Sequence, residues 1–206
     1  GGGALSDGAY SDCTVLVTDS AGNASSTVTL TSFTVDSTSP TLSETTAVST
    51  PTSDTTPDVV ITSDEAGSVT YGGSCESTTT TVTAAANTIT LSASGGAALS
   101  EGAYSDCTIT VTDALGNASS ALTLTSFTVD TTAPTISEST AVTTPTSDTT
   151  PDVVITSDEA GTATYGGSCE SSTTSISATT NTITLIASGG GALSDGAYSD
   201  CTVLVT

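Results

Sequence analysis

The sequence predicts an all-β protein built as a tandem array of small β-sandwiches, and three observations support this. Val, Ile, Leu and Thr alternate in short runs, which is typical of strands because β-branched residues favour extended backbone. Clusters of Gly, Pro, Asp and Asn interrupt these runs about every ten residues, as turns between short strands would. The sequence also repeats with a period of 94 residues, the size of a whole small domain.

The repeat is visible in the cysteines, since Cys13, Cys107 and Cys201 are spaced by 94 residues (107 − 13 and 201 − 107). Residues 19–112 and 113–206 align without a gap and are identical at 72 of 94 positions. Most of the differences exchange Ser for Thr, Val for Ile or Ala for Thr. Such similarity indicates copies of one domain.

The repeat also predicts where the domains begin and end. Residues 1–18 return unchanged as 189–206, so the sequence reads as a window onto a longer array. The segments TSFTVDSTSPT and TSFTVDTTAPT each end a strand with Asp, small residues and Pro, which breaks a strand ladder. We therefore expect three parts: 1–34, the C-terminal part of one repeat; 35–129, a complete repeat; and 130–206, most of a third, truncated repeat.

About seven strands are expected in each 94-residue repeat. In the last expected strand, Leu122 and Leu124 occupy even positions whereas Phe127 and Val129 occupy odd ones, and this change predicts a β-bulge near 125–126. The Gly-rich segment 94–103 is expected to be a loop. Seven short strands joined by turns favour an immunoglobulin-like sandwich. The expected strands are 41–48, 59–61, 69–75, 77–83, 89–93, 107–111 and 122–129.

The charge of the chain is entirely acidic. Its 206 residues include 22 Asp and Glu and no Lys, Arg or His. Such a polyanion has nothing with which to neutralise phosphates, so nucleic acid is excluded as a partner. No apolar run approaches the length that spans a bilayer, so membrane insertion is not expected. The electrostatic partners of this chain would be cations, with Ca²⁺ the foremost candidate.

The five cysteines fit a disulfide framework. Cys75 and Cys107 are 32 residues apart (107 − 75), as are Cys169 and Cys201 (201 − 169). Each pair is expected at one end of neighbouring strands and is predicted to form a disulfide, with two free buried thiols as the alternative. The partner of Cys13 would precede residue 1. Disulfides imply an oxidising compartment, so an extracellular location is expected.

Carboxylates gather at turns that should meet where the chain enters a sandwich. Oxygen ligands converging there could hold Ca²⁺, which takes about 6–8 oxygens. The alternative is that these Asp and Asn residues only start turns by bonding local backbone. Tyr104, just before an expected strand, is assigned a structural role like that of the tyrosine corner. The candidate ligands are Asp36, Asp64, Glu65, Asp113 and Asn117, with Asp130, Asp158 and Glu159 in the next repeat.

Four motifs give the chain a resemblance to a known family: TTAPTIS, PTSDTTPD, SDEAGTATYGGSC and DGAYSDCTVLVTDSAGN. Together they resemble the bacterial Ig-like repeats of giant surface adhesins and biofilm-associated proteins, over essentially the whole chain. The resemblance implies a bacterial cell-surface stalk that carries a terminal adhesive domain away from the cell. It also implies that Ca²⁺ could stiffen the domain junctions, with no cofactor strictly required.

The leading functional prediction is therefore a structural stalk or filament segment of an extracellular adhesin or surface fibre. Its expected partners are neighbouring repeats of the same chain, with lateral or end-to-end self-association. One alternative is a binding face for ice, glycan or a partner protein, formed by threonine rows such as TVTLTSFT. Another is a fibre in which strands are exchanged between chains. Catalysis is not expected, because His-, Lys- and Arg-based schemes have no residues here.

Overall fold

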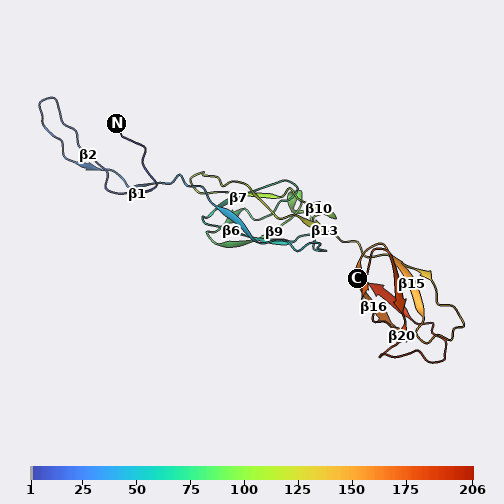
Figure 1. Cartoon of the computed structure of the whole chain (residues 1–206). Coiled ribbons are helices and arrows are strands. Elements are labelled where there is room, and N and C mark those ends of the chain that lie inside the picture. Colours follow the sequence, from blue (N-terminus) through green and yellow to red (C-terminus); the bar gives the residue numbers. More distant parts are fainter. Residues whose placement is uncertain (1) are drawn as a thin grey trace. The chain divides into compact units, whose positions relative to one another are not determined.

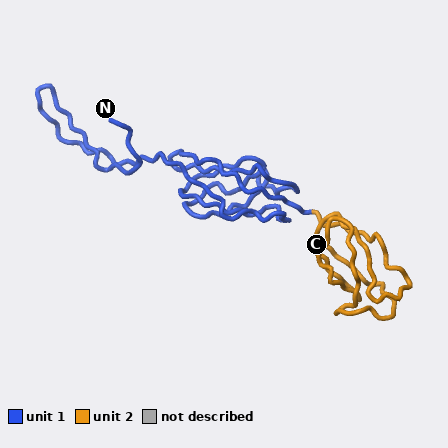
Figure 2. Tube along the Cα trace, in the orientation of Figure 1, with its two compact units in different colours: residues 1–131 blue, residues 132–206 orange. Residues whose placement is uncertain are grey.

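The computed structural model describes residues 2–206, and these form an all-β chain whose single helical turn is the 3₁₀ segment Ser94–Gly96 (η1). The strands form several small sheets (Figure 1). Two compact units are present: residues 1–131 (unit 1) and residues 132–206 (unit 2) (Figure 2). The division falls two residues after position 129, where the complete repeat is expected to end. The three repeat boundaries themselves stay predictions.

The larger part of unit 1 holds two antiparallel sheets, and Figure 1 shows β6 and β9 in one layer with β7 in the other. The first sheet has the order β5-β6-β9 and the second the order β12-β11-β7-β8. The first comprises Leu42–Thr46 (β5), Asp58–Ser63 (β6) and Ala86–Thr90 (β9), and the second Leu122–Thr123 (β12), Thr108–Thr112 (β11), Gly67–Gly72 (β7) and Thr81–Val82 (β8).

The core lies between these sheets, as the alternation of apolar residues predicts. Val59 and Ile61 of β6 are fully buried, as is Val111 of β11, while Val60 of β6 and the threonines on either side of Val111 are more exposed. Strand side chains alternate between the two faces, so one face of each sheet supplies the core. One cluster of buried residues joins both layers, which is a β-sandwich arrangement.

The last predicted strand is divided into two strands with different partners. Leu122–Thr123 (β12) pairs with β11, whereas Phe127–Val129 (β13) pairs with Gly102–Tyr104 (β10). The parity change near 125–126 therefore marks a change of partner rather than a bulge within one strand. The same division occurs in the threonine row TVTLTSFT, which contributes to two short strands instead of one.

Two sequence predictions for this region are wrong. The segment 94–103 is not wholly a loop, because its end belongs to β10, whose partner β13 lies 25 positions later and could not be recognised locally. Cys75 does not lie on the strand assigned to 69–75, because β7 ends at Gly72 and Gly73 turns the chain with a φ of +78°. A Cβ on Gly73 would lie 2.0 Å from the carbonyl oxygen of Asp106, so a side chain is excluded there.

Residues 2–35 repeat the pairing of β10 to β13 without the rest of the sandwich. Gly8–Tyr10 (β1) pairs with Phe33–Val35 (β4), and Thr14–Val15 (β2) pairs with Val28–Thr29 (β3). No counterpart of β5 to β9 precedes them in the described residues. Their apolar side chains are accordingly exposed: Phe33 is 41% exposed, against 2% for its counterpart Phe127.

Unit 2 has the same strand order, but only as far as Thr206. Its sheets are ordered β14-β15-β19 and β18-β16-β21, with a further pair β17-β20. Its strands are Ile136–Thr140 (β14), Asp152–Ser157 (β15), Gly161–Gly166 (β16), Cys169–Glu170 (β17), Ser175–Ile176 (β18), Thr180–Thr184 (β19), Ile186–Ala187 (β20) and Thr202–Val205 (β21). The counterparts of β12 and β13 would follow Thr206, outside this sequence.

Candidate metal site

Three carboxylates predicted as metal ligands come together in unit 1. Asp36, Glu65 and Asp113 each offer an oxygen, and these oxygens all lie within 4.8 Å of one another. Asp36 follows β4, Glu65 lies in the turn between β6 and β7, and Asp113 follows β11. We call these three residues the acidic cluster. Among residues 2–206 it is the one group of three acidic, Cys or His side chains with this spacing.

Local turn chemistry places each member of the cluster. The Ser63 hydroxyl donates to the Glu65 carbonyl at 2.6 Å, which closes the β6–β7 turn. The Asp113 carboxylate accepts the backbone N–H groups of Leu115 and Asn117, each at 2.8 Å. The Asn117 amide donates to the Asp113 carboxylate at 2.7 Å and to the Asp36 carbonyl at 3.2 Å. Asp36, which lies in the linker after β4, is thereby tied to the turn after β11.

The charges of the cluster oppose one another. Loss of solvent raises the pKa of the Glu65 carboxyl above its ordinary value, and the neighbouring negative charges, Asp36 first, raise it further. The pKa of Asp113 is instead lowered, chiefly by the side-chain hydrogen bond from Asn117. Three carboxylates within this distance therefore repel one another near neutral pH, and a bound cation would relieve that repulsion.

The donor set fits a hard cation. Ca²⁺–oxygen distances of about 2.3–2.6 Å place the ligand oxygens of one ion up to about 5 Å apart, and the spacing of the cluster lies within this limit. Three carboxylates supply fewer than the roughly 6–8 oxygens that Ca²⁺ takes, so backbone carbonyls or water would complete the shell.

Two other predicted ligands have different roles in the structure. The Asp64 carboxylate accepts the Thr41 N–H at 2.6 Å, and this bond is the main cause of its lowered pKa. Asp64 is therefore not part of the cluster, because it anchors the chain just before β5. Asn117 contributes through its amide nitrogen, which positions Asp36 and Asp113. Asn117 therefore acts both within its turn and on the linker, whereas the bond of Asp64 to Thr41 spans 23 positions and is not a local turn bond.

The predicted ligands of the following repeat are divided between the units. Asp158 accepts the Thr135 N–H at 2.7 Å, as Asp64 accepts that of Thr41, and this bond lowers its pKa. The Glu159 carbonyl accepts the Ser157 hydroxyl at 2.6 Å. The counterpart of Asp113 would be position 207 (113 + 94), beyond the sequence. Asp130 belongs to unit 1, whereas Asp158 and Glu159 belong to unit 2.

Sequence reasoning missed Asp7, whose carboxylate binds the linker residues that follow Asp36. Its carboxylate accepts the Ser37 N–H at 3.0 Å, the Ser37 hydroxyl at 2.7 Å and the Thr38 hydroxyl at 2.7 Å. These bonds lower the pKa of Asp7, and its charge contributes to the raised pKa of Glu65. Its counterpart Glu101 accepts the Thr131 hydroxyl at 3.1 Å. The available signal was an acidic residue before GAY in every copy.

Carboxylates elsewhere are bonded to hydroxyl groups. Asp58 accepts the Thr90 hydroxyl at 2.6 Å, and Asp152 accepts the counterpart Thr184 at the same distance. The carboxylate of Glu44 accepts both the N–H and the hydroxyl of Thr125, at 2.8 and 2.7 Å. Threonine and serine thus occupy the role that Lys and Arg have in most proteins, because this sequence has no basic side chain.

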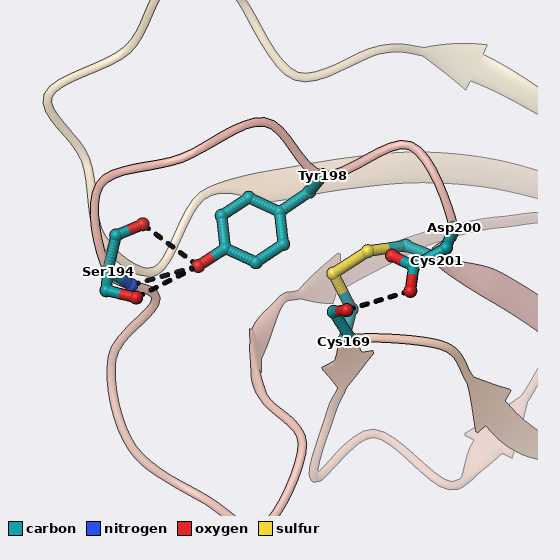
Figure 3. Close-up of a disulfide and its surroundings, with 6 residues drawn as sticks. Cys169, Ser194, Tyr198, Asp200 and Cys201 are labelled. Atoms are coloured by element: carbon teal, nitrogen blue, oxygen red, sulfur yellow. Dashed lines mark hydrogen bonds between the residues drawn. A yellow bond between two sulfur atoms is a disulfide. The ribbon is translucent and has the colours of Figure 1, made fainter.

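Both predicted disulfides are present: Cys75–Cys107 and Cys169–Cys201, with Cα atoms 5.1 and 5.2 Å apart. Cys13 is a free thiol in the described residues. Beside the second disulfide, the Tyr198 hydroxyl donates to the Ser194 carbonyl at 2.9 Å (Figure 3). The equivalent bond from Tyr104 to Ser100 measures 2.8 Å, so this tyrosine has a structural role in both units.

Comparison with known proteins gives no identification. No protein-family model matches the chain, and no curated protein is similar to it. None of the helical residues described is part of a segment long and apolar enough to cross a membrane. The two disulfides indicate a non-reducing environment.

Proposed function

We propose that this chain is a segment of a tandem array of immunoglobulin-like domains that acts as an extracellular stalk or surface filament. Support for the domain type comes from the two sheets of unit 1. When the strands of an immunoglobulin-like domain are lettered A to G in chain order, β5-β6-β9 corresponds to A-B-E and β12-β11-β7 corresponds to G-F-C. The short strand β8 adds to β7 rather than to β9, a variation on the constant-type order. Bacterial adhesins remain the proposed protein class.

The observation that carries the proposal is the bonding of the linker that follows each β13-type strand. Asp7 binds the linker residues Ser37 and Thr38, and its counterpart Glu101 binds Thr131. The bond is repeated after 94 residues (101 − 7), so it belongs to the repeat. A short linker bonded by side chains restricts the rotation of one domain against the next, which a spacer requires.

Other features suit a stalk under load. Unit 1 and unit 2 each carry a disulfide between cysteines 32 residues apart, which limits how far the chain can be extended. A net charge of −22 keeps chains soluble and separate. The chain also has no Lys or Arg, so it offers no site to proteases that cleave after basic residues.

Small-angle X-ray scattering of the 206-residue chain tests the stalk. A single compact domain of this length would have a radius of gyration of about 17 Å, and a stalk segment is expected to exceed that value clearly. The double variant Asp7→Ala/Glu101→Ala should broaden the distribution of interdomain distances, since the linker bonds are lost. Asp12→Ala removes a carboxylate of the same hairpin outside the linker bonds and should change nothing. A compact wild-type chain would refute the stalk.

We further propose that Ca²⁺ binds the acidic cluster and stiffens the linker. Calcium at tenfold excess over its dissociation constant should stabilise unit 1 by about 1.4 kcal/mol by mass action, seen as a rise in its melting temperature. Glu65→Gln removes one of the three carboxylates and should abolish most of this rise. Glu138→Gln, a carboxylate outside the cluster, is the matched control. An equal rise in both variants would mean that calcium acts only by general screening.

Without calcium, Glu65→Gln is expected to have the opposite effect. The raised pKa of Glu65 means that folding disfavours its ionised form, so stability falls as the pH rises from the unfolded pKa through the folded one. The amide side chain of the variant cannot ionise, so the variant should melt above the wild type at pH 7. The two should converge at pH 3, where the carboxyl is protonated in both states. A difference that persists at pH 3 would contradict this origin.

A further inference from the structure

The first and last segments of the sandwich in unit 1 lie side by side and run in the same direction. Thr52, between β5 and β6, forms a parallel bridge with Val129 of β13. The Thr52 N–H donates to the Thr128 carbonyl at 3.0 Å, and the Asp130 N–H donates to the Thr52 carbonyl at 2.8 Å. The Thr50 hydroxyl accepts the Thr128 N–H at 3.0 Å. These bonds join the segment before β6 directly to the segment that leaves the sandwich.

A second contact joins the same two segments. The Glu44 carboxylate of β5 accepts the N–H of Thr125 at 2.8 Å and its hydroxyl at 2.7 Å. Val48, between the two contacts, is 7% exposed and belongs to the same core cluster as β13. Hydrogen bonds beside such packing are electrostatically stronger than hydrogen bonds in water. We call residues 44–52 and 125–130, with the bonds between them, the terminal clasp.

The bonding residues of the terminal clasp recur in the other copies of the repeat. Each copy is displaced by 94 residues, and no bonding side chain of the clasp is exchanged for another type. The clasp is therefore a property of the repeat sequence and not of one copy. Glu44, Thr50 and Thr52 recur as Glu138, Thr144 and Thr146, and Thr125 and Thr128 have the earlier counterparts Thr31 and Thr34.

The direction of the two segments determines how tension acts on the clasp. In the proposed stalk, tension enters the sandwich at the linker before β5 and leaves it at the linker after β13, so this inference rests on the proposed function. Because the segments are parallel, tension pulls the first toward its N-terminal end and the last toward its C-terminal end. The bonds run across the strand direction, so this sliding strains all of them together. Pulling both segments from the same end would instead break the bonds one after another.

The Cys75–Cys107 disulfide limits how far an opened sandwich can lengthen. Tension along the chain passes through this bond, so the 32 residues between its ends stay out of the path. Residues 36–131 are 96 in number (131 − 35), and about 64 of them (96 − 32) can be drawn out. At about 3.5 Å per extended residue this is a length of about 220 Å. Reduction of the disulfide would add about 110 Å.

We propose that the terminal clasp is the element that bears tension in each sandwich, and that the disulfide is the stop that limits lengthening after the clasp opens. A stalk built in this way keeps its length until the tension breaks the clasp. It then lengthens by one fixed step for each sandwich that opens, and the load on its attachment falls with each step. The residues between Cys75 and Cys107 remain a closed loop, which shortens the segment that must find its place again when tension ends.

Force spectroscopy of the 206-residue chain, held by its two termini at constant force, tests the clasp. Opening of the sandwich is recognised by its step of about 220 Å, against about 150 Å for unit 2 (75 − 32 residues). Thr50→Val/Thr125→Val removes two clasp hydroxyls and should speed opening about tenfold, as expected for two lost hydrogen bonds. Thr83→Val/Thr90→Val is the matched control, because it removes the hydroxyl bonds of two exposed threonines between the disulfide-linked cysteines. Its opening rate should stay near that of the wild type.

Urea unfolding separates the position of the bonds from their contribution to overall stability. Without tension the two double variants should lose similar free energies of unfolding, since each lacks two hydroxyl bonds of exposed threonines. Under tension only the clasp variant should open faster. Equal opening rates of the two variants under tension would overturn the proposal.

The direction of pulling gives an independent measurement with the clasp intact. Ser53→Cys, in a chain that also carries Cys13→Ser, moves one handle to the exposed residue that follows Thr52. Both clasp segments are then pulled from the same end, and the sandwich should open at a clearly lower force than between the termini. Equal forces in both directions would overturn the proposal. Extended scattering with equal forces refutes the clasp alone, whereas a compact chain refutes the stalk and with it the role of the clasp under tension.

Discussion

Phe127→Ala should lower the free energy of unfolding of the sandwich in residues 36–131 by about 3–5 kcal/mol, the range for truncating a buried phenylalanine. Phe127 is 2% exposed, belongs to the main core cluster and stacks on Tyr104. Truncation removes apolar contacts and leaves a cavity that the two sheets can close only in part. Because small domains are stable by about 5–15 kcal/mol, this one change removes a large fraction of the total.

The sequence itself provides the matched control, Phe33→Ala. Phe33 has the same neighbours in sequence and stacks on Tyr10 at a comparable centroid distance, 5.3 Å, but is 41% exposed. Its truncation should change stability by about 1 kcal/mol or less. Calorimetry of dilute, monomeric chains is the measurement, and only the transition of unit 1 should move in Phe127→Ala. Equal effects of the two substitutions would mean that Phe127 is not a core residue.

Removal of the Cys75–Cys107 disulfide should be nearly as damaging. Cys75→Ala/Cys107→Ala opens a loop whose ends are 32 residues apart, and the chain-entropy relation gives a loss of about 3–4 kcal/mol for that length. Both cysteines are 2% exposed, and alanine avoids placing a new polar group in the core. Urea unfolding should show a lower midpoint, and a larger surface exposed by the opened denatured chain should raise the slope.

Cys13→Ala is the control for the disulfide variant, since Cys13 is a free thiol in the described residues. It should leave the midpoint unchanged. Reductant added to the wild-type chain should reproduce the loss in the transition of unit 1, and should leave that transition unchanged in the double variant, where only the Cys169–Cys201 bond of unit 2 can still be reduced. A double variant as stable as the wild type would show that the bond adds nothing to the stability of the folded chain.

Much of the fold could be predicted because the strands bury one face. The apolar run Val59–Ile61 indicates β6, and the alternation of Ile109 and Val111 with threonine assigns β11 to a half-buried position. The strand β10 was missed because its three residues, GAY, carry no alternation and are strand only through pairing with β13. The local sequence does not indicate which distant segments pair with each other.

The candidate site could be predicted in part for a similar reason. Asp113 and Asn117 were identified because they start a turn, and the structure uses them in that way. The choice between adjacent Asp64 and Glu65 could not be made, because it depends on which side chain reaches Thr41 and which reaches the linker. Asp7 lies 30 residues before its partner Ser37 (37 − 7), so no local pattern connects them.

The bonding of carboxylates to hydroxyl and amide groups has a consequence for ionic strength. In most proteins salt screens attractions and repulsions together, and its net effect on stability depends on their balance. Here the sequence has no Lys, Arg or His, so the bonds of Asp58, Asp152 and Glu44 to threonine involve no attraction between opposite charges. Dissolved salt therefore screens only the mutual repulsion among acidic side chains. The folded state of this chain is accordingly more stable in a saline medium than in fresh water.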